Sequence, residues 1–469
     1  MSSNRFRWVF CQLDTLRRCM PSSIRQSLDG LPDTLDDTYE RALQGIHKER
    51  RQHAHRLFQC LLTAIRPPRV QELAEMFAID FGSNAVMEGW RPQNPEEAIL
   101  STCSTLITVT GEEGSRVVQF SHFSVKEYLT SDRLCNSVNG NIRHYHITLD
   151  AAHTILARAC LTVLLQLHEG TDKKHLAKFP LALYAAQHWV DHAKYELVAS
   201  QIRGAMEQLF NPSKSYLVAW ARLHDVDRDS VRLPVGVLPS WPRPTALYYA
   251  VLCGFSELAE HLIVAHAEDV NVKCGFYGSP LHAALYKGHL DAARVLLEYG
   301  ADKNLENPDG KTPLVTAYDR GNLEGMRLLL RYGANGAVPY SPFGLLLHGA
   351  SYRGQAEVTR LLLQYNSDVN ARGVGNLTPL DRASMQGHAN VAQLLLECGA
   401  EVNAQTMAQD TPLHRASRNG HLEVVQTLLR HRADVHIRGQ GDWTPLQVAR
   451  SRGHIEVVRL LIERGAERE

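Results

Sequence analysis

Gly310, Lys311 and Thr312 come nearest, in this sequence, to the chemistry of a nucleotide-binding loop. A phosphate-binding loop of that type needs another glycine five positions before the one that precedes its lysine, because the loop backbone must surround the phosphates. Leu305 occupies that position. The Asp309-Gly310 dipeptide also favours a turn. We therefore interpret this stretch as a turn and predict no bound cofactor.

Other catalytic and metal-binding patterns are missing from the sequence. It contains no Gly-x-Ser-x-Gly elbow of an α/β hydrolase, no His-Glu-x-x-His motif and no paired cysteine ligand set. His53 and His55, like His144 and His146, stand two residues apart. That spacing does not place two side chains on one face of a helix. We therefore expect no enzyme activity and no metal ion.

The two residues that directly precede each copy of a recurring glycine are of types that are typical of protein interfaces. These positions are Tyr286-Lys287, Asp319-Arg320, Tyr352-Arg353, Met385-Gln386, Arg418-Asn419 and Ser451-Arg452. The second position holds no acid, and arginine and aromatic anchors are enriched at binding hot spots. We predict a basic strip that binds an acidic protein segment, with these candidate residues: Tyr286, Lys287, Arg320, Tyr352, Arg353, Met385, Arg418 and Arg452. The alternative is that bases gather there only because helix C-termini favour them.

These candidate positions belong to a unit that repeats from Thr245 to the C-terminus. Clear copies begin at Ser279 and Thr411, and imperfect copies begin at Thr245, Thr312, Leu345, Thr378 and Thr444. A glycine follows each start at a fixed offset: Gly254, Gly288, Gly321, Gly354, Gly387, Gly420 and Gly453. Every step is 33 residues except the first, which is 34. This period predicts a solenoid of about seven repeats.

Each repeat contains the signals for two short helices. Thr411 can cap a helix that starts with Pro412, where the missing N–H of proline is not needed. Gly420 then ends this helix, since a left-handed backbone costs glycine little. An apolar stripe from Val424 to Leu429 marks the second helix. Neighbouring repeats must stack to bury that stripe.

The repeated unit resembles the ankyrin repeat, chiefly over Thr411–His414, Gly399–Ala404 and Asp309–Leu314. The resemblance covers nearly half of the chain. It implies stacked helix pairs that bind proteins through hairpin tips and through the concave face of the first helices. The predicted basic strip would line that face.

Seven histidines on repeat positions are expected to make hydrogen bonds between repeats: His282, His289, His348, His388, His414, His421 and His454. Three repeats depart from the pattern. Tyr248 and Gln447 replace the histidine of the Thr-Pro-Leu-His tetrad in the first and last repeats, which fits a capping role. Leu345-Leu346-Leu347 is degenerate in the fourth repeat, and we interpret it as tolerated drift.

The composition limits the class of protein. The 469 residues could form about three domains. Lys+Arg and Asp+Glu number 50 each, so no overall field attracts nucleic acid or an anionic membrane. The nine cysteines form no Cys-x-x-Cys pair, which favours a reducing compartment. No apolar run approaches the roughly 20 residues that span a bilayer. We expect a soluble cytoplasmic protein with no membrane partner, the nucleus being the alternative.

Upstream of the repeats, the sequence predicts two further helical regions. Four prolines mark the boundary before the repeats: Pro234, Pro239, Pro242 and Pro244. Apolar residues recur at helical spacing from about Thr148 to Leu223, which predicts a helical bundle. Thr34-Leu35-Asp36-Asp37 can cap a helix, and residues 50–65 form an amphipathic one that Pro67-Pro68 ends.

Two more helices, Arg69–Phe77 and Pro95–Leu106, precede a β-hairpin formed by Thr105–Thr110 and Arg116–Phe120. Three helices followed by a hairpin is the winged-helix arrangement. Winged helices often bind DNA, and a basic cluster is present: Lys48, Arg50, Arg51, Arg56, Arg66 and Arg69. Acids stand where phosphate contacts would be needed, at Glu96, Glu97, Glu112 and Glu113. DNA binding is therefore disfavoured, and we interpret the basic cluster as a solvated helix face.

Several motifs together resemble the segments that follow the ATPase core in fungal NACHT–ankyrin proteins of the NOD-like receptor class. They are Phe6-Arg7-Trp8-Val9 with Cys11-Gln12-Leu13, Leu31–Arg41, Phe120–Leu129, and Tyr184–Trp189 in the helical spacer. The winged helix is similar to the module named after GPI inositol-deacylase, a name that implies no deacylase chemistry. In such receptors a histidine in the position of His122 reaches the ADP phosphate. The chain begins just past the expected ATPase, so we expect a truncated paralogue or an incomplete sequence.

The sequence therefore predicts a predominantly α-helical protein with four regions. Residues 1–47 form a helical segment, 48–134 a winged-helix domain with a small β-hairpin, 140–232 a helical spacer, and 244–469 the ankyrin repeats. We predict a non-enzymatic interaction protein that resembles the sensor half of a NACHT–ankyrin receptor, with a NACHT module in cis or in trans as a partner. The alternative is a stand-alone adaptor that delivers clients to another enzyme. His122 would sense nucleotide only if a NACHT module is present, and otherwise packs at a strand-to-helix junction.

Overall fold

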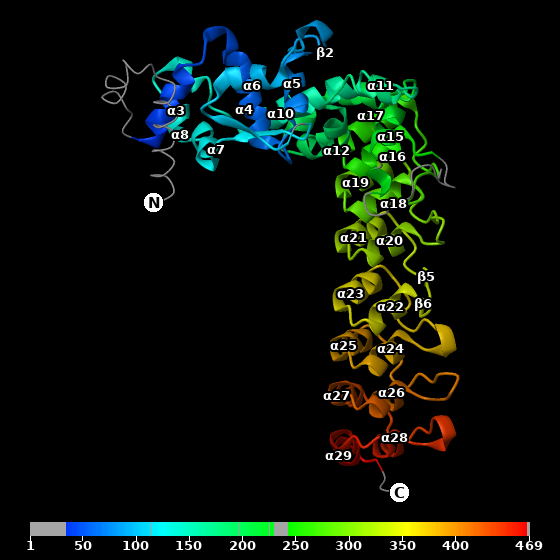
Figure 1. The fold of residues 1–469 in the computed structure, drawn as a ribbon. Coiled ribbons are helices and arrows are strands. Elements are labelled where there is room, and N and C mark those ends of the chain that lie inside the picture. Colours follow the sequence, from blue (N-terminus) through cyan, green and yellow to red (C-terminus); the bar gives the residue numbers. More distant parts are fainter. Residues whose placement is uncertain (1–33, 113, 196, 225, 229–242, 467–469) are drawn as a thin grey trace. The chain divides into compact units, whose positions relative to one another are not determined.

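The computed structural model describes residues 34–112, 114–195, 197–224, 226–228 and 243–466. The motifs predicted at 6–13 and 31–33, Glu113 and the prolines at 234, 239 and 242 lie outside these residues. The chain divides into two compact units, Met1–Val237 and Leu238–Glu469. We call them the N-terminal unit and the repeat array. Helices dominate both units, as the sequence predicted (Figure 1).

The first part of the N-terminal unit has the predicted order of helices and a hairpin. Its elements are α3 (Leu35–Gln44), η2 (Lys48–Arg50), α4 (Arg51–Thr63), α5 (Val70–Ala74), η3 (Glu75–Phe77), β1 (Ile79–Asp80), β2 (Ala85–Val86), η4 (Glu88–Trp90), α6 (Pro95–Cys103), β3 (Ile107–Thr110), β4 (Val117–Phe120), α7 (Phe123–Leu129), α8 (Asp132–Cys135) and α9 (Gly140–Arg143). Strands β3 and β4 pair antiparallel, with Ile107 opposite Phe120. The cap of α3 is also confirmed, because the Thr34 side chain accepts a hydrogen bond from the Asp37 N–H at 3.1 Å.

The second part of the N-terminal unit is a helical bundle. It contains α10 (Leu149–Leu164), α11 (Lys173–Leu176), α12 (Ala182–Ala193), α13 (Val198–Gln201), α14 (Arg203–Leu209), α15 (Tyr216–Leu223) and η5 (Val226–Arg228). Its centre is an aromatic cluster in which Trp189 contacts Phe210 and Trp220, with ring centroids 6.1 and 5.4 Å away. The Trp220 indole N–H donates to the Ala186 carbonyl at 2.9 Å. Both tryptophans are fully buried.

The repeat array consists of seven helix pairs, one for each predicted repeat. Its elements are α16 (Ala246–Cys253), α17 (Ser256–His266), α18 (Pro280–Lys287), α19 (Leu290–Glu298), α20 (Pro313–Asp319), α21 (Leu323–Arg331), α22 (Leu346–Tyr352), α23 (Ala356–Gln364), α24 (Pro379–Gln386), α25 (Ala389–Glu397), α26 (Pro412–Asn419), α27 (Leu422–Arg430), α28 (Pro445–Ser451) and α29 (Ile455–Glu463). Figure 1 shows the first helices in one row and the second helices in another. In the fifth to seventh repeats, apolar side chains between the rows form one core that runs from Leu380 to Ala466.

The glycine that ends a first helix is required for two reasons. Gly354, Gly387 and Gly420 all have positive φ values, between +70° and +82°, which only glycine adopts at little cost. A Cβ at Gly420 would also lie 2.5 Å from a ring atom of His454 in the next repeat. The glycine therefore ends the helix and makes room for the next histidine.

The fourth repeat has an aromatic hairpin that packs against its own first helix. Its hairpin contains two short strands, β5 (Pro339–Tyr340) and β6 (Gly344–Leu345). The Tyr340 ring packs on α22 at Gly349, where a Cβ would come within 2.6 Å of the ring. Gly349 thus allows an aromatic hairpin to lie against its helix.

Candidate functional site

Histidines join the repeats and so fix the spacing of the first helices. The Nε2 atoms of His282, His348 and His414 lie 3.0 Å from backbone carbonyls of the next hairpin, those of Lys311, Leu377 and Trp443. A second set comprises His388, His421 and His454, whose Nε2 atoms lie 3.0 Å from carbonyls of the preceding repeat. The hydrogen bonds predicted between repeats are confirmed for these six residues. Burial lowers the pKa of His282 to about 4, which keeps it neutral at pH 7.

The third and fifth repeats lack the tetrad histidine, departures that we did not predict: Val315 and Asp381 stand in its place. Asp381 replaces the tetrad histidine and bonds only within its own repeat, where its Oδ2 accepts from the Thr378 N–H at 2.8 Å. Its Oδ1 is buried without a hydrogen-bond partner among the described residues. Burial raises the pKa of this carboxyl to about 6, although the hydrogen bonds from Thr378 act to lower it.

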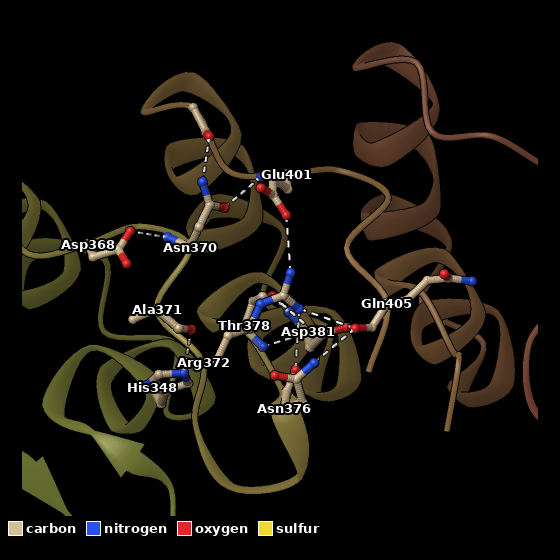
Figure 2. A network of polar contacts seen from close by, with 11 residues as sticks. His348, Asp368, Asn370, Ala371, Arg372, Asn376, Thr378, Asp381, Glu401 and Gln405 are labelled. Atoms are coloured by element: carbon tan, nitrogen blue, oxygen red, sulfur yellow. Dashed lines mark hydrogen bonds and ion pairs between the residues drawn. The ribbon is translucent and has the colours of Figure 1, made fainter. Parts of the chain in front are cut away.

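Figure 2 shows the polar network that surrounds this position. Arg372 pairs with Glu401 of the next repeat at 3.1 Å and also donates to the Gln405 carbonyl. Asn370 accepts from the Glu401 N–H at 2.8 Å, and Asn376 also donates to the Gln405 carbonyl. The loops of the fifth and sixth repeats are therefore joined by side chains where the tetrad histidine is missing, in addition to the bond from His421 to the Met385 carbonyl.

Replacing Asp381 with histidine is expected to stabilise the repeat array. The imidazole would restore a hydrogen bond to the Asp410 carbonyl of the next hairpin and would remove a buried acid, a gain of about 1 kcal/mol. Urea unfolding followed by circular dichroism at pH 7 measures the difference. Asp381→Ala is the control, because it loses the bonds to Thr378 and should destabilise by about 1 kcal/mol. A histidine variant less stable than the parent would contradict this account.

The predicted interface residues lie on one face, which we call the first-helix face. It is formed by the first helices from α18 to α28 and by the hairpin tips beside them. Lys287, Arg320, Arg353 and Arg452 are exposed there, whereas the other predicted residues are half-buried: Tyr286, Tyr352, Met385 and Arg418. The structure thus places all eight on this face, one or two in each repeat.

Arginines on this face stack on aromatic rings. The Arg320 guanidinium lies 4.1 Å from the ring centroid of Tyr286 in the preceding repeat. Arg353 lies 5.5 and 5.3 Å from the rings of Tyr318 and Tyr340. We call the stacked set the arginine–aromatic row; its members are Tyr286, Tyr318, Arg320, Tyr340, Phe343, Tyr352, Arg353 and Arg382. Each cation–π contact of this kind contributes about 0.5–1 kcal/mol at exposed sites.

Sequence reasoning missed half of this row. Arg382 stacks on Phe343 at 5.4 Å, and the Phe343 ring lies 4.6 Å from that of Tyr352. Arg382 stands one helical turn before the two positions we compared, and Arg415 holds the same position in the next repeat. The aromatic residues of the hairpin Pro339–Leu345 were the sequence feature that could have revealed the missed members of the row.

Some basic side chains on the face already pair with acidic residues of the chain and are less available to a ligand. Arg418 is bound to the buried Asp410 carboxylate at 2.8 Å, and Arg415 lies 4.0 Å from the same group. Lys311 pairs with Asp319 at 2.6 Å. The hairpin tips add exposed apolar side chains, Val374 at 61% and Met407 at 81% exposure. The face therefore combines stacked arginines with apolar tips.

His122 in the N-terminal unit caps α7. Its Nδ1 accepts from the Ser124 N–H at 3.2 Å and lies 2.5 Å from the Ser124 hydroxyl, which also contacts the Tyr39 hydroxyl at 2.7 Å. The ring is half-buried, and the neighbouring Phe123 is 60% exposed. This geometry matches the packing interpretation of His122 at a strand-to-helix junction.

The basic cluster of the winged helix is not simply a solvated face, so that interpretation is wrong for three of its members. Arg56 is half-buried and stacks on the Phe81 ring, 4.6 Å from its centroid. Arg51 donates to the Asn141 side chain at 2.6 Å, and Arg66 pairs with Glu72. These guanidinium groups hold elements of the fold together.

In the part of the chain that the structure describes, no three or more His, Cys, Asp or Glu side chains are arranged to hold a metal ion. Nor does any helix in the described ranges combine the length and the apolar character that a membrane span requires.

Comparisons with known proteins agree with the two kinds of module. The family model for ankyrin repeats matches three stretches, residues 244–339, 343–406 and 405–468. The model described as the GPI inositol-deacylase winged helix domain matches residues 39–139. A relative from Monascus ruber, the azaphilone pigments biosynthesis cluster protein L, is 29% identical over 294 residues, which is 59% of this chain. The chain matches only 61% of that protein's length.

Two solved structures match the array at 29% identity. The human ASB11 ankyrin repeat domain covers 48% of this chain and 100% of its own length, with a TM-score of 0.40. The ankyrin repeat domain of Bcl-3, described as a unique member of the IkappaB protein family, covers 46% of this chain and 98% of its own, with a TM-score of 0.42. The chain therefore contains ankyrin repeats and a winged helix domain of the GPI inositol-deacylase type, and ankyrin repeats imply a protein–protein interaction module.

Proposed function

We propose that the chain is a non-enzymatic protein that binds an acidic protein segment on the first-helix face of its repeat array. The observation that carries the proposal is the exposed, ring-stacked guanidinium groups of Arg320 and Arg353. Stacking orients these groups, and a guanidinium presents a planar set of donors that suits carboxylates. Two acidic residues of the first helices do not compete for these groups, since Asp319 pairs with Lys311 and Asp381 is buried.

A charge reversal tests this function. The triple variant Lys287→Glu, Arg320→Glu and Arg353→Glu is expected to weaken binding of a fluorescent poly-glutamate peptide about tenfold or more, because favourable charge pairs become repulsive. Fluorescence anisotropy at low salt measures the affinity. The matched control reverses three arginines on second helices, Arg327, Arg360 and Arg459, which are exposed and pair only with glutamates of their own helices. If the two triple variants bind the peptide with equal affinity, the first-helix face is not the binding surface.

The larger context we propose is the sensor half of a fungal NACHT–ankyrin receptor. In that case a NACHT module in cis or in trans would contact the winged helix, and His122 would lie near its nucleotide. The fungal relative and the winged helix type are what support this context. A stand-alone cytoplasmic adaptor is the alternative, and it would bind clients without a NACHT module. Co-purification of the chain with a separately expressed NACHT module distinguishes the two.

A further inference from the structure

The arginine–aromatic row supplies one stacked guanidinium from each of three consecutive repeats. Arg320, Arg353 and Arg382 belong to the repeats that start at Thr312, Leu345 and Thr378, respectively. Since a guanidinium stacked on a ring has already lost much of its rotational freedom, it loses less entropy when a carboxylate binds its edge.

The repeat spacing restricts which ligands can meet Arg320 and Arg353, which hold equivalent positions in consecutive repeats. Packed helices lie about 8–10 Å apart, so carboxylates that meet these two groups must lie on one side of the ligand at about that interval. Arg382 lies about one helical turn earlier on its own helix and extends the row beyond this pair. A chain in the polyproline II conformation returns to the same side every three residues and advances about 9 Å in doing so. A β-strand returns every two residues, after about 7 Å, and falls out of step with the repeats.

The rings between the arginines favour the same ligand conformation. Tyr286, Phe343 and Tyr352 are half-buried and present part of each ring at the surface. Segments in the polyproline II conformation dock on aromatic surfaces, where proline rings pack without a large loss of entropy. The exposed apolar tips at Val374 and Met407 offer further contact to the ligand.

We infer that the repeat array recognises the spacing of acids in its ligand: an extended, proline-containing protein segment in the polyproline II conformation, with an acidic residue at every third position. This inference rests on the proposed function, to which it adds the conformation and the register of the acidic segment. The pair of Arg320 and Arg353, at equivalent positions of consecutive repeats, defines that register.

Three fluorescent peptides of equal net charge test this inference with the full chain. The first repeats the triplet Asp-Pro-Ala, the second has the same composition with its aspartates contiguous, and the third is a helical peptide with Glu at every seventh position. The triplet peptide is expected to bind about tenfold more tightly than the contiguous one. Arg353→Gln together with Arg382→Gln should abolish that preference. The control Arg360→Gln, on the second helix of the repeat that contains Arg353, should leave the preference unchanged.

The outcomes separate this inference from the proposed function. Equal binding of the triplet and contiguous peptides, both weakened by the charge reversal on the first-helix face, would overturn the spacing inference and leave the function standing. Tighter binding of the helical peptide would likewise overturn it. Failure of every acidic peptide to bind would overturn both. Circular dichroism of each variant confirms that the repeats remain folded.

Discussion

Replacement of Trp189 with alanine is expected to lower the free energy of unfolding of the N-terminal unit by about 3–5 kcal/mol. The Trp189 ring is fully buried and makes edge contacts with Phe210 and Trp220 from two other helices of the bundle. Removing it deletes the centre of that aromatic cluster. The Trp220 N–H bond to Ala186 also depends on the packing of α12. A cavity of this size cannot close without moving several helices.

Urea unfolding of the full chain, followed by fluorescence of the remaining tryptophans, measures this loss. Trp90→Ala is the matched control, because Trp90 is 54% exposed and its removal should change stability by less than about 1 kcal/mol. Similar losses for the two variants would mean that the cluster does not hold the bundle together. The repeat array should unfold at an unchanged urea concentration in both.

The repeats could be predicted from the sequence because most of them contain complete local signals. A capping threonine or serine, a proline and a glycine occur within about ten residues, and these residues act mainly on their own backbone. The recurring glycine keeps the period through the first and fourth repeats, which lack the proline. The bonds between repeats were predicted for seven histidines from their repeat positions, and they are confirmed for six of them. The departure at Asp381 was missed because a carboxylate fits the same cap, as its bonds to Thr378 show.

The arginine–aromatic row was only half visible in the sequence because it depends on contacts between repeats. Tyr318 and Tyr340 come from different repeats, and their ring centroids lie 5.2 Å apart only once the hairpin packs on the helices. In the N-terminal unit, Arg51 binds Asn141, 90 residues later in the chain. Helical periodicity reports on one element at a time and does not predict such pairs.

A buried hydrogen-bonded chain makes the N-terminal unit sensitive to acid. The Ile65 N–H donates to the Tyr184 hydroxyl at 3.1 Å, and His192 Nε2 lies 3.0 Å from the same oxygen. His192 Nδ1 lies 2.9 Å from His153 Nδ1, so one of these two nitrogen atoms must donate and the other accept. Protonation of both imidazoles breaks the chain, because each Nδ1 would then carry a proton. Burial, with smaller contributions from His153 and His188, lowers the pKa of His192 to about 3.

The direction of the pH dependence follows from this shift. The unfolded chain binds a proton at His192 near pH 6.5, whereas the folded chain does so only near pH 3. The unfolded state therefore gains protons first as the pH falls, and stability present above pH 6.5 is lost below it. Between pH 6.5 and 4.5 the loss is about 2–3 kcal/mol for this residue.

His192→Gln isolates this effect, because an amide can accept from Tyr184 and donate to His153 but does not titrate in this range. We expect the variant to be less stable than the parent at pH 7 by about 1 kcal/mol, since the amide geometry is imperfect. As the pH falls, the unfolding free energy of the variant should decrease less steeply than that of the parent. The two slopes should differ by up to about 1.4 kcal/mol per pH unit. Urea unfolding at pH 7, 5.5 and 4.5 provides the comparison. Because other titrating groups are common to both proteins, parallel curves would mean that a different group causes the acid sensitivity.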